Sequence, residues 1–266
     1  MKYAIWIVVV LALAAGGYYW WRQQHPPAPA AVEVPSSPAA AGEAAIQHPI
    51  EQAQTETPPA STPTPLPALG DSDSAAQDAL KDLFGAKALL LFYLNDVIRR
   101  IVATVDNLPR DKVALRLMPL KPVPGRLVVG SFVDGMALAD ENALRYAAYV
   151  QLVDALSAPK LVAVYVHFYP LFQQAYQDLG YPKGYFNDRL VLAIDNLLAT
   201  PELAQPIRLQ QPSVLYQFAD PDLEARSAGQ KMLLRMGRDN AAIVKRKLRE
   251  IRHALVADAP QPADGH

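Results

Sequence analysis

The residues with the clearest chemical potential lie in one stretch, YPLFQQAYQDLGYPKGYFNDRLVLAIDNLLATP, residues 169–201. Aromatic rings beside amide and guanidinium donors can stack on sugars or hold a peptide. The same residues also have a structural interpretation, in which the rings cover the edge of a core and the amide caps a helix. Both interpretations stay open. The candidate binding residues are Tyr176, Tyr181, Tyr185, Asn187 and Arg189.

Two carboxylates in this stretch, Asp188 and Asp195, permit a hydrolytic alternative. Their seven-residue separation places them on one face of a predicted helix at 188–199. Glycoside hydrolysis needs two carboxyl groups about 5 to 9.5 Å apart, one of them with a raised pKa. No motif specifies that separation here, and the helix dipole alone favours an acidic residue in a first turn. These two residues are therefore the candidate catalytic pair of a secondary interpretation.

Composition argues against several other kinds of site. The chain has no cysteine, which excludes thiolate nucleophiles, disulfides and cysteine-based metal sites. None of its five histidines pairs with another at helical spacing, so we expect no metal site and no cofactor. The formal net charge of −1 does not favour a nucleic acid partner. We expect a binding protein rather than an enzyme.

The N-terminus predicts a membrane anchor. Residues 3–21 form an uncharged, mostly apolar run, close to the roughly 20 residues that cross a bilayer. The run ends in the aromatic residues 18–21 and Arg22, followed by no Lys or Arg until Lys81. This pattern predicts a single-pass inner-membrane protein with a cytoplasmic N-terminus and a periplasmic domain. A cleaved signal peptide, with the small residues at 12–14 as its cleavage site, is the alternative.

The rest of the chain divides by composition. Proline, alanine and small polar residues dominate after the anchor, and such a segment cannot bury enough surface to become ordered. Apolar periodicity then predicts a mainly helical domain with two short β-hairpins or extended excursions, one between 110 and 135 and one between 207 and 218. The predicted organisation is a transmembrane anchor at 1–22, a disordered linker at 23–70, a helical domain at 71–257 and a frayed tail at 258–266.

Helical spacing also predicts the individual helices. Asn187 is expected to be the N-cap of the one at 188–199. The others are expected at 75–84, 87–106, 142–157, 159–179, 222–226, 228–236 and 240–256.

Two blocks of sequence carry a resemblance to a known family. These are the stretch at 169–201 and VLYQFADPDLEARSAGQKMLLRMGRDNAAIVKRKL at 214–248. They resemble uncharacterised bacterial envelope proteins that have one N-terminal membrane helix and a domain of unknown function. The resemblance extends over about 71–255 and implies the same anchor, linker and domain, without any catalytic residue.

Together these features predict a non-enzymatic, membrane-anchored binding or scaffolding protein of the bacterial envelope. Its expected partner is an envelope protein or peptidoglycan, and residues 3–21 would contact the inner membrane. The alternative is a peptidoglycan hydrolase that uses Asp188 and Asp195.

Overall fold

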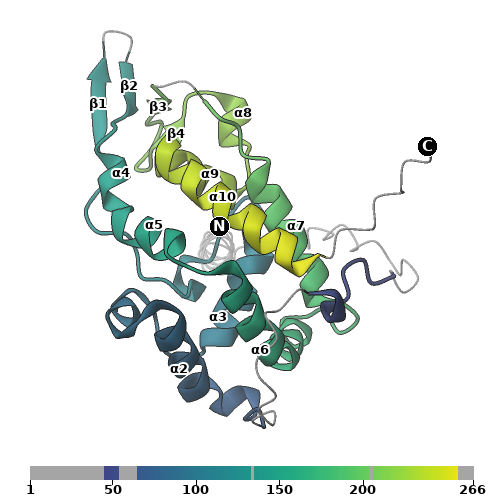
Figure 1. Ribbon diagram of the computed structural model, residues 1–266. Helices are drawn as coiled ribbons and strands as arrows, with labels where there is room; N and C mark the ends of the chain where they lie inside the picture. Colours follow the sequence, from purple (N-terminus) through teal and green to yellow (C-terminus); the bar gives the residue numbers. More distant parts are fainter. Residues whose placement is uncertain (1–44, 54–64, 133–134, 204–205, 257–266) are drawn as a thin grey trace, which may run out of the picture. The chain divides into compact units, whose positions relative to one another are not determined.

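The computed structural model describes residues 45–53, 65–132, 135–203 and 206–256 (Figure 1). The described residues from Ile46 to Val256 belong to one compact unit. The predicted anchor at 1–22 and the predicted tail at 258–266 lie outside the described residues. Within the described part, no single helix is long and apolar enough to cross a membrane. Only α5 (Ala147–Asp154) and α6 (Ala158–Asp178) pass that test, as a pair bent by 87°.

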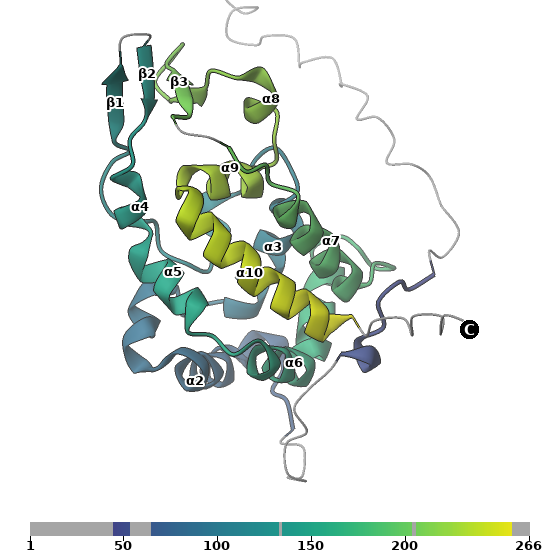
Figure 2. The ribbon, with the colours of Figure 1, turned by 45° about the horizontal axis from the view of Figure 1, so that its top comes forward.

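The body of the domain is helical, as predicted, and α6 is its central element. This helix contacts α2 (Asp73–Phe84), α3 (Val97–Asn107), α7 (Phe186–Leu198) and α10 (Arg238–Leu255). Figures 1 and 2 show α10, in yellow, crossing the layer that contains α6 and α7. The main buried cluster draws all of its aromatic side chains except Phe186 from α6, because apolar and aromatic residues recur there at three- and four-residue steps.

The start of α6 follows ordinary capping rules. Ser157 precedes the helix and its Oγ accepts the N–H of Lys160 at 3.5 Å, while Pro159 lies in the first turn. Pro170 lies inside the helix and its side chain is exposed. The helix continues through it as one element, and Gly180, with φ at 116°, follows its end.

The helix predicted at 87–106 is wrong in its first half. That half is a short 3-10 helix at Ala86–Leu91, and α3 begins only at Val97. The carboxylate of Asp73 in α2 accepts the N–H groups of Asp96 at 2.8 Å and Val97 at 3.0 Å. A side chain from another helix thus satisfies the first orphan donors of α3, and Asp96 adopts a left-handed φ of 52° before it.

The first β excursion, predicted between 110 and 135, lies later in the chain, because residues 115–117 form a 3-10 turn and the strands cover 129–132 and 135–138. This hairpin and the second predicted excursion belong to one sheet. β1 (Val129–Phe132), β2 (Gly135–Leu138), β3 (Arg208–Gln210) and β4 (Gln217–Phe218) form one antiparallel sheet in the order β1-β2-β3-β4. A separate apolar cluster, with Leu209 and Phe218 at its centre, lies against this sheet. The short helices α4 (Asn142–Arg145), α8 (Pro221–Glu224) and α9 (Ala228–Arg235), together with α5, connect the sheet to the helical body. The remaining 3-10 turns are Ile50–Gln52, Leu69–Asp71 and Leu115–Leu117.

Candidate functional site

A short segment from the proline-rich part of the chain lies against the first turn of α7. We call residues 46–53 the docked segment; it contains the 3-10 turn Ile50–Gln52 and lies within the range where composition predicts a disordered linker. Figures 1 and 2 show it in purple near α7, although more than 130 residues separate the two in the chain.

Side chains at the start of α7 hold the docked segment by its main chain. The Asp188 carboxylate accepts the N–H of Gln47 at 3.1 Å and that of His48 at 2.7 Å. The Asn187 amide donates to the His48 carbonyl at 2.8 Å, and the Tyr185 hydroxyl accepts the N–H of Ile50 at 2.8 Å. Each of these hydrogen bonds therefore ends on a backbone atom of the segment.

A hydrogen bond from α6 fixes the orientation of the Asn187 side chain. Its side chain is fully buried, and its Oδ1 accepts a hydrogen bond from the Tyr165 hydroxyl of α6 at 3.2 Å. With its oxygen occupied, the amide presents its N–H group to the segment. The expected N-cap role of Asn187 is wrong, because α7 begins at Phe186 and Tyr185 occupies the capping position.

Gln173 of α6 holds the turn before α7 in place. Its Nε2 donates to the Gly184 carbonyl at 2.7 Å, and its Oε1 accepts the N–H of Phe186 at 2.8 Å. The Tyr169 hydroxyl donates to the same Oε1 at 3.1 Å. Burial, followed by interaction with Tyr185, raises the pKa of the Tyr169 hydroxyl, so this donor stays protonated at neutral pH.

Ile50 provides an apolar anchor for the segment. It is 9% exposed and belongs to the main buried cluster, whereas its neighbours Glu51 and Gln52 are exposed. The segment is thus held by one buried side chain and by a row of main-chain hydrogen bonds.

The other candidate binding residues belong to an ionic network around the buried carboxylate of Asp106. Arg189 donates from Nε to Asp106 Oδ1 at 3.0 Å and from Nη2 to the Asp106 carbonyl. Arg110 Nη2 contacts Asp106 Oδ2 at 2.7 Å, and it donates to the Tyr181 hydroxyl at 2.5 Å. Tyr176 stacks on Tyr181 with the ring centroids 4.6 Å apart. This network joins α3 to the α6–α7 turn.

Asp106 is the important residue that the sequence reasoning missed. It is 4% exposed and lies at the end of α3. Ile98 and Val102 precede it at four-residue steps on the buried face of the helix. An acidic residue on an otherwise apolar helical face was the available signal, because such a group is buried only with partners.

The hydrolytic alternative receives no support from the geometry. Asp188 is occupied by the docked segment, whereas Asp195 pairs with Arg252 of α10 at 2.5 and 3.2 Å and is exposed. A rise of 1.5 Å per residue separates their positions by about 10 Å along α7, which exceeds the spacing of glycosidase carboxylates.

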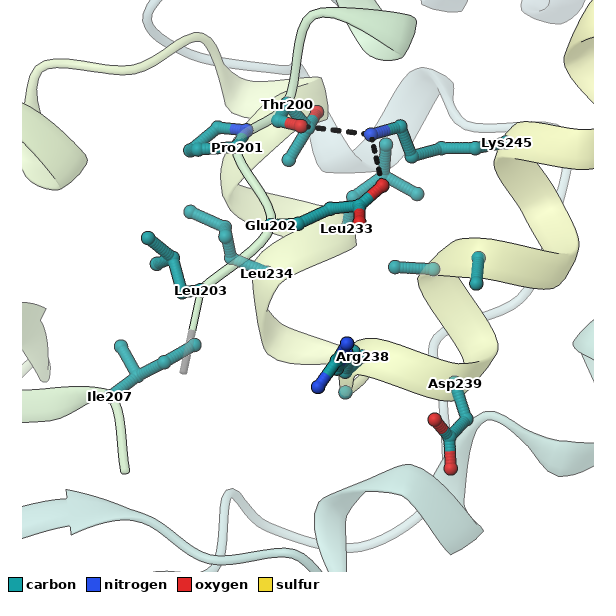
Figure 3. Close-up of a pocket in the computed structure, with 13 residues that line it drawn as sticks. Thr200, Pro201, Glu202, Leu203, Ile207, Leu233, Leu234, Arg238, Asp239 and Lys245 are labelled. Carbon is teal, nitrogen blue, oxygen red and sulfur yellow. Dashed lines mark hydrogen bonds and ion pairs between the residues drawn. The ribbon is translucent and has the colours of Figure 1, made fainter. Parts of the chain in front are cut away.

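A cavity of about 310 Å³, lined by apolar and charged side chains, lies between the chain after α7 and helices α9 and α10 (Figure 3). Lys245, which is 6% exposed, donates to the Thr200 carbonyl at 3.0 Å and to Glu202 at 3.2 Å. These partners neutralise its charge, so the cavity offers no free ammonium to a ligand. Within the described ranges no group of three or more His, Asp or Glu side chains could hold a metal ion.

Comparison with known proteins gives a family without a known function. Residues 97–252, more than half of the chain, match the model described as protein of unknown function (DUF3014). The match includes Tyr185, Asn187 and Asp188 but ends short of the docked segment and α2. No curated protein and no solved structure matches the chain. The chain therefore belongs to the DUF3014 family.

Proposed function

We propose that this protein is a non-enzymatic binding module that captures a short segment of a partner protein by its main chain at the start of α7. The observation that carries the proposal is the docked segment, which shows how the site holds a peptide main chain. Tyr185, Asn187 and Asp188 together offer acceptors and a donor to a backbone that bends at Gln47 and His48 and turns at Ile50–Gln52.

The contacts define the kind of peptide that the site would accept. Gln47 and His48 are held only through N–H and carbonyl groups, which every residue except proline can offer. Pro49 lacks an N–H group and is skipped by the hydrogen bonds, while Ile50 is buried. The partner segment is therefore a short peptide with a proline followed by a branched apolar residue, and it turns where the docked segment does.

In this proposal the docked segment is an intramolecular competitor. A segment joined to the domain has an effective concentration that can reach the millimolar range. An external segment must displace it, so the free protein binds partners more weakly than the exposed site would.

The proposal also includes the location of the protein in the cell. The apolar run at 3–21, its aromatic end and the absence of Lys and Arg until Lys81 favour an inner-membrane anchor with a periplasmic domain. A periplasmic location would make envelope proteins the expected partners. The resemblance to anchored envelope proteins supports the same layout.

The binding site can be tested with the full chain and a labelled peptide of residues 45–53. Deleting 46–53 should expose the site, so we expect fluorescence polarisation to give binding at least about tenfold tighter than with the unaltered chain. Asp188→Ala and Asn187→Ala in the deletion background should abolish it. Asp195→Ala is the matched control, because this carboxylate on the same helix does not contact the segment. A folded deletion variant that does not bind the peptide would overturn the proposal.

The location can be tested separately because the chain has no cysteine. A membrane-impermeant maleimide added to spheroplasts should label Gln174→Cys, an exposed position on α6. It should not label Lys2→Cys until the membrane is broken. The opposite labelling pattern would place the domain on the cytoplasmic side.

A further inference from the structure

We propose that the helical body binds a single aliphatic chain in a cavity between α2, α3, α6, α7 and α10. The cavity has a volume of about 240 Å³ and is separate from the surface that holds the docked segment. Protein interiors normally leave few voids larger than one water molecule. This space is much larger and is partly open to solvent, so an apolar occupant can enter it.

The cavity wall selects an apolar occupant. Apart from Tyr165, its lining consists of alanine, valine, leucine, isoleucine and phenylalanine side chains. The Tyr165 hydroxyl donates to Asn187 instead of the cavity. Water in such a space would lose its hydrogen bonds, and apolar cavities of comparable size stay dry and take up hydrocarbons.

The arrangement of the lining favours an unbranched chain over a ring system. The lining residues of α6 begin at Leu161 and end at Phe172, which corresponds to about 16 Å along the helix axis. A wall of this length suits one extended alkyl chain.

The volume of the cavity also limits the length of the alkyl chain that it can hold. An apolar cavity of about 150 Å³ takes up benzene, so this one should accommodate roughly eight to ten carbon atoms. Either a free fatty acid or a lipid could supply such a chain. In both cases the polar end must remain outside, because the wall offers it no hydrogen bond.

The first test uses the full chain and two neutral ten-carbon probes, 1-decanol and 1-adamantanol. Isothermal titration should give saturable binding of the linear alcohol and at least about tenfold weaker binding of the cage-shaped one. In methyl NMR spectra, 1-decanol should shift the signals of Val162 and Ile194, two residues of the wall. Equal binding of both alcohols, or shifts confined to other methyl groups, would overturn the proposal.

Filling the cavity provides the second test. Ala79→Leu adds volume to the wall from α2 and should weaken 1-decanol binding by about tenfold or more. Ala148→Leu is the matched control, since Ala148 is exposed on α5 and does not line the cavity. If Ala79→Leu does not fold, Val164→Ile fills the cavity by one methylene from α6. Unchanged binding in the folded filling variant would show that the alcohol binds elsewhere.

Decanoate and dioctanoyl-phosphatidylglycerol can then distinguish the two sources of the alkyl chain, a free fatty acid and a lipid. Preferential binding of decanoate would identify a free fatty acid, and preferential binding of the phospholipid would identify a lipid. If neither decanoate nor the phospholipid binds, and 1-decanol does not bind either, the proposal is refuted. None of these outcomes depends on capture of a peptide, so this inference and the proposed function can fail independently.

Discussion

The docked-segment site and the apolar cavity share aromatic residues, but they would recognise their ligands by different interactions. The rings of Tyr165 and Phe186 line the cavity. On the polar side, the Tyr165 hydroxyl donates to Asn187, the residue that follows Phe186. Phe186 also stacks on Phe172 of α6, with ring centroids 5.8 Å apart. The polar site depends on directed hydrogen bonds, whereas the cavity depends only on size and shape. The rings of Tyr165 and Phe186 thus separate a site that binds backbone groups by hydrogen bonds from a cavity that selects its ligand by volume.

The largest effect that we expect on the polar side comes from Asp106→Ala. Removing this buried carboxylate leaves Arg189, a 19% exposed side chain, without its partner, and the expected loss of stability is about 3 to 5 kcal/mol. Urea unfolding followed by circular dichroism would measure it. Asp195→Ala is the control and should cost less than about 1 kcal/mol, because its pair with Arg252 is exposed. Similar losses in both variants would contradict the distinction between the two ion pairs.

A smaller effect should reveal whether the two regions are coupled. Asn187→Ala removes the acceptor of the buried Tyr165 hydroxyl and the donor to His48. We expect a loss of about 2 kcal/mol, since a buried polar group is left unsatisfied. Adding Tyr165→Phe removes that orphan hydroxyl and should recover part of the loss. A double-mutant cycle by urea unfolding measures the coupling, and strictly additive effects would separate the polar site from the cavity wall.

Ile50→Ala should release the docked segment without unfolding the domain. Truncating this buried anchor should cost about 2 kcal/mol of docking free energy. Hydrogen exchange should then show lost protection at the Gln47 and His48 amides, with protection in α6 retained. Glu51→Ala is the control because this side chain is exposed. Loss of protection in α6 as well would assign the segment to the global fold.

The smallest effect at neutral pH concerns the two tyrosines. Burial raises the pKa of the Tyr165 and Tyr169 hydroxyls above the ordinary value of 10.0. The folded state therefore binds their protons more tightly than the unfolded state, so their contribution to stability is complete below pH 10 and is lost as the pH rises further. Urea midpoints should fall above pH 10, and they should fall less in Tyr169→Phe. An identical alkaline loss in that variant would exclude Tyr169 as a source.

Much of the helical body follows from local sequence. The predicted helices at 159–179 and 240–256 correspond to α6 and α10, because an apolar stripe with ordinary helix ends predicts an element without knowledge of its neighbours. The concentration of polar and aromatic groups around Tyr185 lies at the turn that holds the docked segment. Its residues serve two purposes, however, since Tyr185, Asn187 and Asp188 hold the segment whereas Arg189 is part of the Asp106 network.

Tertiary contacts decided what local patterns could not. Asp73 interrupts a continuous helical pattern by capping α3 from α2, and β2 pairs with β3 from a distant part of the chain. The docked segment has the composition of a linker, and its backbone is held by polar side chains at the start of α7, far away in the sequence. The sequence by itself determined which segments become helical, because periodicity is local. The three-dimensional structure decided which groups meet, because buried charges and free backbone groups take partners wherever the fold brings them close.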